Sequence, residues 1–201
     1  AVLAVDRNPV SLRRLRRRAR EAGMGAVRTE KPEEAPERPR IRTLERDLTD
    51  LADASPAGFG LSPVPPFDAV VSLPACGSAS DLALAIAVER GLPFAVSPCC
   101  IGKVNRGSGS IAYPRSRWLR GLVDPEQHAL LAQAADYAPT SEGGSREHKV
   151  RGRRAKMVVE RDRLEYARER GYEVCIVALP RMGSDYSKRE LLLGAPQGSR
   201  A

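Results

Sequence analysis

The segment 68–103 contains two short apolar runs, each of which ends in a turn that carries cysteine. The first run leads into Pro74-Ala75-Cys76-Gly77, and the second leads into Pro98-Cys99-Cys100. Between them, residues 79–90 repeat apolar side chains with the period of an α-helix and end at a glycine. A buried parallel strand is a continuous apolar run, and a crossover helix must return the chain before a second parallel strand can form. The segment is therefore predicted to be a strand, helix, strand unit.

Both cysteine turns follow strands of this predicted unit, so they meet at the carboxyl edge of the sheet. Ligands of open α/β sheets bind at that edge. We therefore expect a site there, and the candidate residues for a substrate pocket are Cys76, Gly77, Asp81, Pro98, Cys99, Cys100 and Lys103. Asp81 and Lys103 are expected as polar groups at the rim, although Asp81 could equally cap the helix that it begins.

The three cysteines of the two turns have three readings. They are structural or substrate-lining thiols, ligands of a metal, or nucleophilic or redox groups. The two Cys-X-X-Cys pairs typical of many zinc sites are absent from the sequence, so no metal is assigned. Cys175 falls inside a predicted strand and is expected in the core.

Acidic residues end two further predicted strands near the start of the chain. Residues 1–5 form an apolar run that ends at Asp6, and a helix is predicted from Pro9 to about Ala22. A strand at 41–44 is followed by Asp47. Acids in this position of nucleotide-binding α/β units accept hydrogen bonds from ribose hydroxyls, although a turn or capping role is equally open for Asp6.

The remaining predicted elements are two helices and two strands, at 125–137, 147–169, 172–179 and 190–193. Alternation of strands and helices indicates a doubly wound sheet with a terminal hairpin. One domain is predicted over 1–201, with loops at about 28–40 and 54–66. The helix positions expected to face inward are Val10, Leu12, Leu15, Ala19, Val150, Met157, Val158 and Leu164. The two histidines, His128 and His148, are expected at the surface.

Composition describes a globular chain with a basic surface. Of its 201 residues, 42% are hydrophobic and 29% charged, and the formal net charge is +8. Arginines line the outer face of the predicted helix at 9–22, which is either a solvated face or a ridge that contacts phosphate. RNA is therefore a possible partner, although arginine-rich composition also follows from a high-GC genome. No apolar run reaches the roughly 20 residues that span a bilayer. Four cysteines without a disulfide pattern indicate a reduced, cytoplasmic setting.

Along the chain, the predicted strands end at Asp6, before Asp47, at the first cysteine turn and at the second, and a helix and a C-terminal hairpin follow. This order resembles the S-adenosylmethionine-dependent methyltransferase fold from its second strand onward. The segment 74–84, followed by Pro98-Cys99-Cys100, resembles the methyltransferase-like domain of the glutathione S-transferase C-terminal-domain-containing proteins. It is more distantly similar to the tRNA ribose 2′-O-methyltransferase of the acceptor stem. Further matching stretches are Tyr113-Pro114-Arg115-Ser116, Ala134-Ala135-Asp136, Arg161-Asp162-Arg163, Gly171-Tyr172 and 193–196.

The resemblance implies an α/β fold, a Rossmann-like class I methyltransferase sheet with helices on both faces and a C-terminal antiparallel hairpin. It also implies S-adenosylmethionine as cofactor, bound by Asp6, Asp47, Leu48, Leu73 and Pro74. The chain begins at what would be the second strand, so the first strand and its glycine-rich loop are expected to be missing. Pro74 stands where the family has histidine, and no catalytic residue is assigned.

The function that follows is an S-adenosylmethionine-dependent methyltransferase that acts on RNA. The alternative is a non-catalytic methyltransferase-like module that binds RNA or a protein, and a nucleotide-binding oxidoreductase is a third, weaker reading. The descriptors expected for the chain are therefore methyltransferase, transferase, S-adenosyl-L-methionine, Rossmann-like, RNA binding and cytoplasmic.

Overall fold

The computed structural model describes residues 2–24, 41–52, 66–104, 111–137, 146–179 and 190–198. The chain divides into two compact units, Ala1–Phe67 and Asp68–Ala201. Each unit mixes helices with strands, so the predicted α/β class is confirmed. The grouping of both units into one methyltransferase-like domain over 1–201 stays a prediction. The predicted loops at 28–40 and 54–66 lie outside the described residues, except for Pro66.

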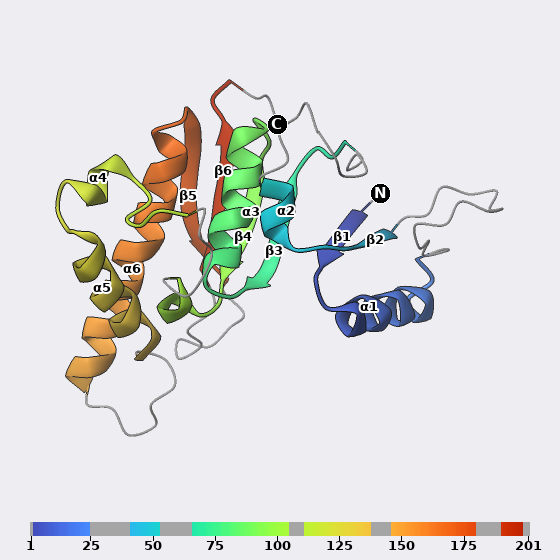
Figure 1. The fold of residues 1–201 in the computed structure, drawn as a ribbon, viewed down its shortest axis with the longest axis horizontal. Coiled ribbons are helices and arrows are strands. Elements are labelled where there is room, and N and C mark those ends of the chain that lie inside the picture. Colours follow the sequence, from blue (N-terminus) through green and yellow to red (C-terminus); the bar gives the residue numbers. More distant parts are fainter. Residues whose placement is uncertain are drawn as a thin grey trace. The chain divides into compact units, whose positions relative to one another are not determined.

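The first unit is built on one pair of parallel strands (Figure 1). Its elements are β1 (Val2–Asp6), α1 (Pro9–Glu21), β2 (Ile41–Glu45) and α2 (Leu48–Ala52). The strands pair in register, with Asp6 opposite Glu45. The Asn8 side chain accepts a hydrogen bond from the backbone N–H of Val10, and Pro9 occupies the first turn of α1. The predicted strands and helix of this unit are confirmed to within two residues.

The inner face of α1 is narrower than its sequence predicts. Leu12 and Ala19 are buried and Leu15 is half-buried, whereas Val10 is 40% exposed. Residues two apart on a helix differ by about 200° in direction, so Val10 lies opposite Leu12 and the expectation for Val10 was wrong.

The second unit contains the predicted strand, helix, strand segment, which is confirmed. Its elements are β3 (Val70–Ala75), α3 (Ser78–Glu89), β4 (Phe94–Pro98), η1 (Ile101–Lys103), α4 (Arg117–Arg120), α5 (Pro125–Tyr137), α6 (Arg146–Arg168), β5 (Tyr172–Ala178) and β6 (Glu190–Pro196). The strand order is β3-β4-β6-β5. β3 and β4 are parallel, whereas β6 is antiparallel to both β4 and β5. The predicted C-terminal hairpin is therefore confirmed.

β3 runs two residues further toward the carboxyl end than the predicted strand, which ended at Leu73, and it includes Pro74. Among the described strands β3 is an edge strand, and its register with β4 shifts between Ser72 and Ala75. Proline is tolerated at an edge or irregularity because its missing N–H removes no regular ladder bond.

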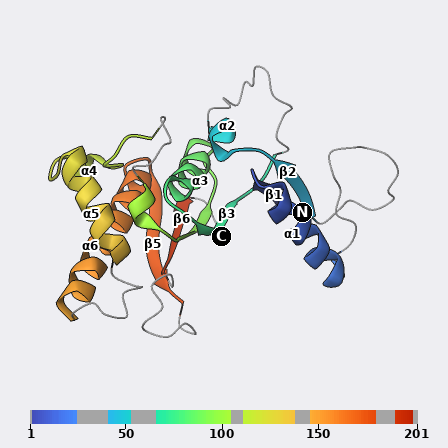
Figure 2. The same cartoon turned by 60° about the horizontal axis from the view of Figure 1, so that its bottom comes forward.

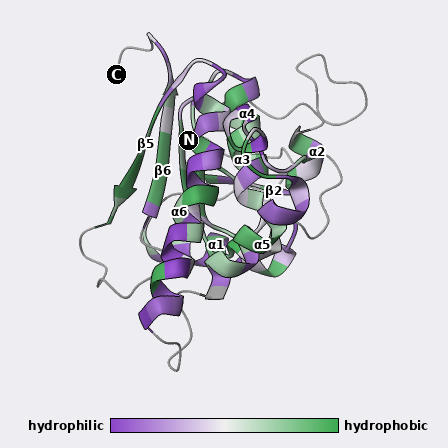
Figure 3. Cartoon of the chain, turned by 90° about the vertical axis from the view of Figure 1, so that its left-hand side faces the viewer, coloured by the Kyte–Doolittle hydropathy of each residue, from purple (hydrophilic) through white to green (hydrophobic). Residues whose placement is uncertain are grey.

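The core of the second unit lies between its sheet and two helices. Leu84 and Ala87 of α3 and Leu164 of α6 pack with Phe94 and Leu192. The Phe94 ring lies where a side chain at position 194 would stand, so β6 needs the glycine found there. Figure 3 shows α3 and α6 on one side of β5 and β6. The exposed Val71 and Leu73 of β3 project from the other face, which no described helix of this unit covers, so the expectation of helices on both faces stays a prediction.

A second apolar cluster joins α5 and η1 to α6, and Figure 2 shows α5 beside α6. The residues of α6 that face inward differ from the predicted ones. Leu164 is buried as expected, but Val150 and Met157 are exposed and Val158 is only half-buried. The buried face instead carries charged side chains together with alanine and valine, namely Ala155, Lys156, Val159, Glu160, Asp162 and Arg163. Hydrophobicity alone could not identify this face, because several of its buried side chains are charged and form ion pairs.

None of the helices in the described ranges has the length and apolar character that crossing a membrane requires.

Candidate functional site: a thiol cluster above a buried ion pair

The two cysteine turns lie side by side at the carboxyl ends of β3 and β4. Ala75 pairs with Pro98 at the last position of the ladder. Beyond it, the backbone N–H of Cys99 donates to the Ala75 carbonyl, and that of Gly77 donates to the Cys100 carbonyl, both at 2.8 Å. Because these bonds continue the sheet past the strand ends, the two turns are held in fixed register.

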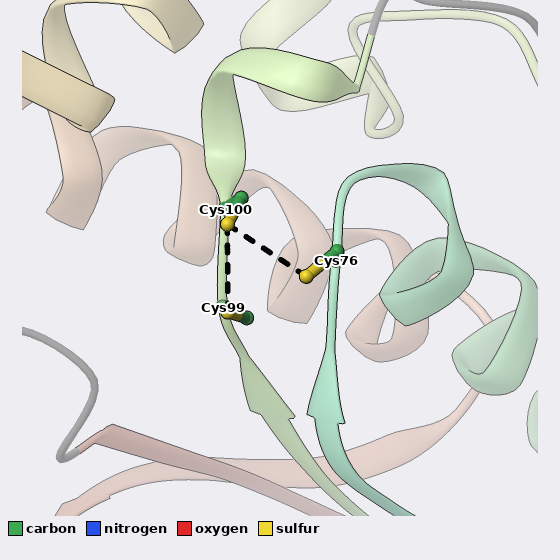
Figure 4. Close-up of side chains that lie close together, drawn as sticks. All are labelled: Cys76, Cys99 and Cys100. Atoms are coloured by element: carbon green, nitrogen blue, oxygen red, sulfur yellow. Dashed lines mark hydrogen bonds between the residues drawn. The ribbon is translucent and has the colours of Figure 1, made fainter. Parts of the chain in front are cut away.

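Three thiols converge in these turns (Figure 4). The Sγ atom of Cys100 lies 3.7 Å from that of Cys76 and 3.5 Å from that of Cys99. All three sulfur atoms lie within 4.8 Å of one another, as the ligands of one metal ion would. Cys76 is exposed, and Cys99 and Cys100 are partly buried. The sequence predicted that the turns would meet, but it assigned the thiols no metal.

Burial, together with hydrogen bonds to its two neighbouring thiols, raises the pKa of Cys100 to about 12. The thiolate is the reactive form of cysteine. Without a metal Cys100 therefore stays protonated at neutral pH, which disfavours the nucleophilic reading for this residue.

Asp136 of α5 holds the chain immediately after the cysteine pair. The backbone N–H of Ile101 donates to Asp136 Oδ1 at 2.7 Å. A Cβ atom at Gly102 would lie 2.5 Å from Asp136 Oδ2, so only glycine leaves room for this contact. The position of Cys100 therefore depends on a helix that follows it in the chain.

A buried ion pair lies beneath the first cysteine turn. Arg163 Nε and Nη2 donate to Asp81 Oδ1 and Oδ2 at 3.0 and 2.9 Å, and Arg163 also approaches the Gly77 carbonyl at 3.4 Å. Burial acts to raise the pKa of Asp81, but the charge and hydrogen bonds of Arg163 hold it below its usual value. Asp81 is 1% exposed, so the expected place at a rim was wrong, and α3 has no side-chain cap.

Further polar side chains complete this buried network. Tyr113 donates its hydroxyl proton to Asp81 Oδ2 at 2.9 Å, and its ring stacks on His128. Asp162 accepts hydrogen bonds from the backbone N–H groups of Arg115 and Ser116. Sequence reasoning missed these partners, although Arg161-Asp162-Arg163 had already been noted as part of the resemblance. The network therefore positions the turn above it through the contact of Arg163 with the Gly77 carbonyl.

His128 and Cys175 lie in settings opposite to those expected. His128 is fully buried, whereas His148 is exposed as predicted. His128 belongs to the face of α5 that packs on α6, which periodicity alone did not show. Cys175 is exposed, because Val174 and Ile176 on either side of it take the inward positions of β5.

Two of the expected cofactor-binding acids lie together in the first unit. Asp6 ends β1, and its Oδ1 accepts from the backbone N–H of Asn8 at 2.8 Å. Asp47 follows β2 and accepts from the N–H and hydroxyl of Thr49, which together with Arg7 keep its pKa low against the opposing effect of burial. Leu48 begins α2 beside it. Both carboxylates make the bonds of turn residues and stay partly exposed.

The other predicted site residues belong to the second unit. Leu73 is 62% exposed on β3, next to the exposed Pro74. Pro98 is the buried last residue of β4. Lys103 ends η1, and its side chain is outside the described part of the structure.

The relatives found among known proteins are glutathione S-transferase C-terminal domain-containing proteins and their homologues. A mouse glutathione S-transferase C-terminal domain-containing protein is 28% identical over 130 residues, which cover 65% of this chain and 20% of that protein. The human protein of that name is 26% identical over 130 residues, with the same coverage. A homologue in Drosophila melanogaster is 33% identical over 112 residues, covering 54% of this chain and 19% of that protein. The chain is similar to this family.

The chain spans about a fifth of the length of the curated relatives it matches. No family model matches the chain, and no solved structure matches it. In the relatives' name, the word transferase is part of the name of a domain of those proteins.

These names support the expected resemblance at modest identity, but they correct the descriptors that the resemblance supplied. The relatives are named for a glutathione S-transferase C-terminal domain and not as methyltransferases. The main descriptors were therefore wrong as a description of this family.

Proposed function

We propose that the chain binds S-adenosylmethionine and takes part in methyl transfer. The observation that carries the proposal is the strand order of the second unit. Two parallel strands, β3 and β4, adjoin a reversed strand, β6, which pairs with β5 in a C-terminal hairpin. This is the arrangement expected of the Rossmann-like methyltransferase sheet, and ligands of such sheets bind at the carboxyl ends of the parallel strands.

The first unit supplies the groups for the nucleoside part of the cofactor. Asp6 and Asp47 lie at the carboxyl ends of paired parallel strands, and neither carboxylate is buried. Ribose hydroxyl groups donate hydrogen bonds to acids in this position. In this proposal Asp6 accepts from the ribose, whereas Asp47 and Leu48 lie near the adenine.

The second unit supplies the exposed edge at which a substrate would be held. Leu73 and Pro74 lie on that edge next to the first cysteine turn, and the cysteine turns would line the substrate side. Methyl transfer requires mainly that the nucleophile be aligned with the methyl sulfonium, so a rigid edge is what the reaction needs from the protein.

The test is calorimetric titration of S-adenosylmethionine, and of its demethylated product, into the full-length protein. Binding in the micromolar range that is lost in Asp6→Ala supports the proposal. Asp50→Ala is the matched control because Asp50 is an exposed acid on α2 of the same unit. Absence of binding by the folded protein, or equal binding by Asp6→Ala, contradicts the proposal and favours the non-catalytic module.

RNA is the acceptor that the charge of the first unit favours. The outer face of α1 carries an exposed arginine ridge of Arg13, Arg14, Arg17, Arg18 and Arg20. Phosphate contacts of arginine supply most of the affinity for nucleic acid that does not depend on sequence.

A further inference from the structure

We propose that Cys76, Cys99 and Cys100 together bind one zinc ion. This inference is independent of the proposed cofactor, because it depends only on the three thiols and on the backbone that holds them. The three residues come from two different turns, and the fold, not their spacing in the chain, brings them together.

The distances between the sulfur atoms fit a shared metal. Sulfur atoms that each lie about 2.3 Å from one zinc ion, at tetrahedral angles, are about 3.8 Å apart. Cys100 lies 3.7 Å from Cys76 and 3.5 Å from Cys99, measured between Sγ atoms. The third pair lies within 4.8 Å, which a small side-chain rotation closes. A metal at the centre of this triangle needs no movement of the backbone.

The backbone around the thiols is fixed before any metal arrives. The bonds from Cys99 to Ala75 and from Gly77 to Cys100 lock the two turns together. Asp136 holds Ile101, the next residue after the pair. Ligands held in this way by their surroundings lose little conformational freedom on binding a metal.

The chemistry of the group selects a soft or borderline cation. Thiolates prefer zinc and monovalent copper over the hard cations that bind oxygen. Three protein ligands leave the fourth position of a tetrahedral zinc ion open, as in catalytic zinc sites. Cys76 is exposed, so solvent or an anionic ligand can reach that position.

Binding replaces three protons by one dication. Each thiol loses its proton to solvent as its sulfur bonds to zinc, so three protons leave and the zinc-trithiolate group carries one negative charge. α3 begins at Ser78, two residues after Cys76, and the positive end of its dipole favours that charge.

The test titrates cobalt(II), a spectroscopic substitute for zinc, into the reduced protein without oxygen. Expected is one equivalent of cobalt with the near-ultraviolet absorption of thiolate-to-metal charge transfer, and displacement of that cobalt by one equivalent of zinc. Serine in place of any one of Cys76, Cys99 or Cys100 should weaken binding by more than the roughly 10–100-fold that is typical of losing an outer partner.

Cys175→Ser is the matched control, because Cys175 is an exposed thiol on β5 of the same unit, outside the cluster. It should keep the full signal. Circular dichroism checks that each variant is folded, and thermal unfolding gives a second readout, since zinc should raise the Tm of the parent and of Cys175→Ser alone. The proposal is overturned if the folded, reduced protein shows no charge-transfer absorption, or if the cluster variants retain it. The proposal would also be overturned if two of the three cysteines formed a disulfide and the protein still bound no metal after that disulfide was reduced.

Discussion

The guanidinium of Arg163 on α6 donates two hydrogen bonds to the carboxylate of Asp81 on α3, at 3.0 and 2.9 Å. The two residues are 82 positions apart, and their side chains are only 2% and 1% exposed. The pair therefore ties the helix between β3 and β4 to the helix that precedes the hairpin. It also fixes the turn that carries Cys76, because Arg163 reaches the carbonyl of Gly77.

Arg163→Met should strongly destabilise the second unit. It leaves the buried carboxylate of Asp81 without its partner, and breaking a buried pair in this way costs about 3–5 kcal/mol of unfolding free energy. Urea denaturation measures the loss. Arg151→Met is the control because Arg151 forms an exposed pair with Glu147 on the same helix, and it should change stability by less than about 1 kcal/mol. Equal effects of the two changes would show that the buried pair adds nothing.

Acid should weaken the fold through His128. Burial lowers the pKa of His128 from 6.5, against the opposing charge of Asp162 and Asp81. The unfolded chain then binds the proton more tightly than the folded chain does. Stability contributed by neutral His128 is therefore fully present above pH 6.5 and is lost as the pH falls from there toward the lowered folded-state pKa.

His128→Phe keeps a ring against Tyr113 and removes the titration. The slope of unfolding free energy against pH, measured between about pH 8 and 5, should become flatter in this variant. An unaltered slope in His128→Phe would exclude His128 as the source.

Gly102→Ala should displace the segment after the cysteine pair. Its Cβ atom would lie 2.5 Å from Asp136 Oδ2, and overpacking of this kind costs about 1–3 kcal/mol. Adding Asp136→Ala removes the clash and should recover part of the loss, which denaturation of the single and double variants measures. Gly121→Ala is the control, since its Cβ would meet backbone atoms no closer than 3.6 Å. A loss that is the same in the single and double variants would contradict the clash.

The arginine ridge of α1 should make RNA binding salt-dependent. The double change Arg13→Gln and Arg17→Gln removes two exposed charges, which should reduce the slope of log affinity against log salt by about 1.4 for single-stranded RNA. Fluorescence anisotropy at several salt concentrations gives this slope. Arg42→Gln, exposed on β2 of the same unit, should leave it nearly unchanged. If the double variant has the same slope as the parent protein, the outer face of α1 is only solvated and does not contact RNA.

Local signals in the sequence were enough to predict most of the elements. Asn8 and Pro9 mark the start of α1, and the glycine at 91 follows the end of α3. Apolar runs predicted β1, β2, β4 and β5, and the helical unit between the cysteine turns predicted that β3 and β4 are parallel. These features are local because capping, turn formation and side-chain periodicity each act over a few residues.

Only the tertiary structure decided which face of α6 is buried and where the thiols lie. Lys156, Asp162 and Arg163 face inward because groups from distant segments pair with them, and sequence periodicity contains no trace of such partners. Glu160 faces inward one turn from Lys156, with which it forms an ion pair on the same helix. The same holds for the cysteines. Their positions after two predicted strands indicated a shared edge, but whether three sulfur atoms come within reach of one metal depends on the register between β3 and β4. The sequence thus determined the strands, the helices and the edge at which they meet, because those follow from local propensity. Side-chain pairing across the core and the geometry of the thiol cluster were decided by packing, since they depend on contacts between residues far apart in the chain.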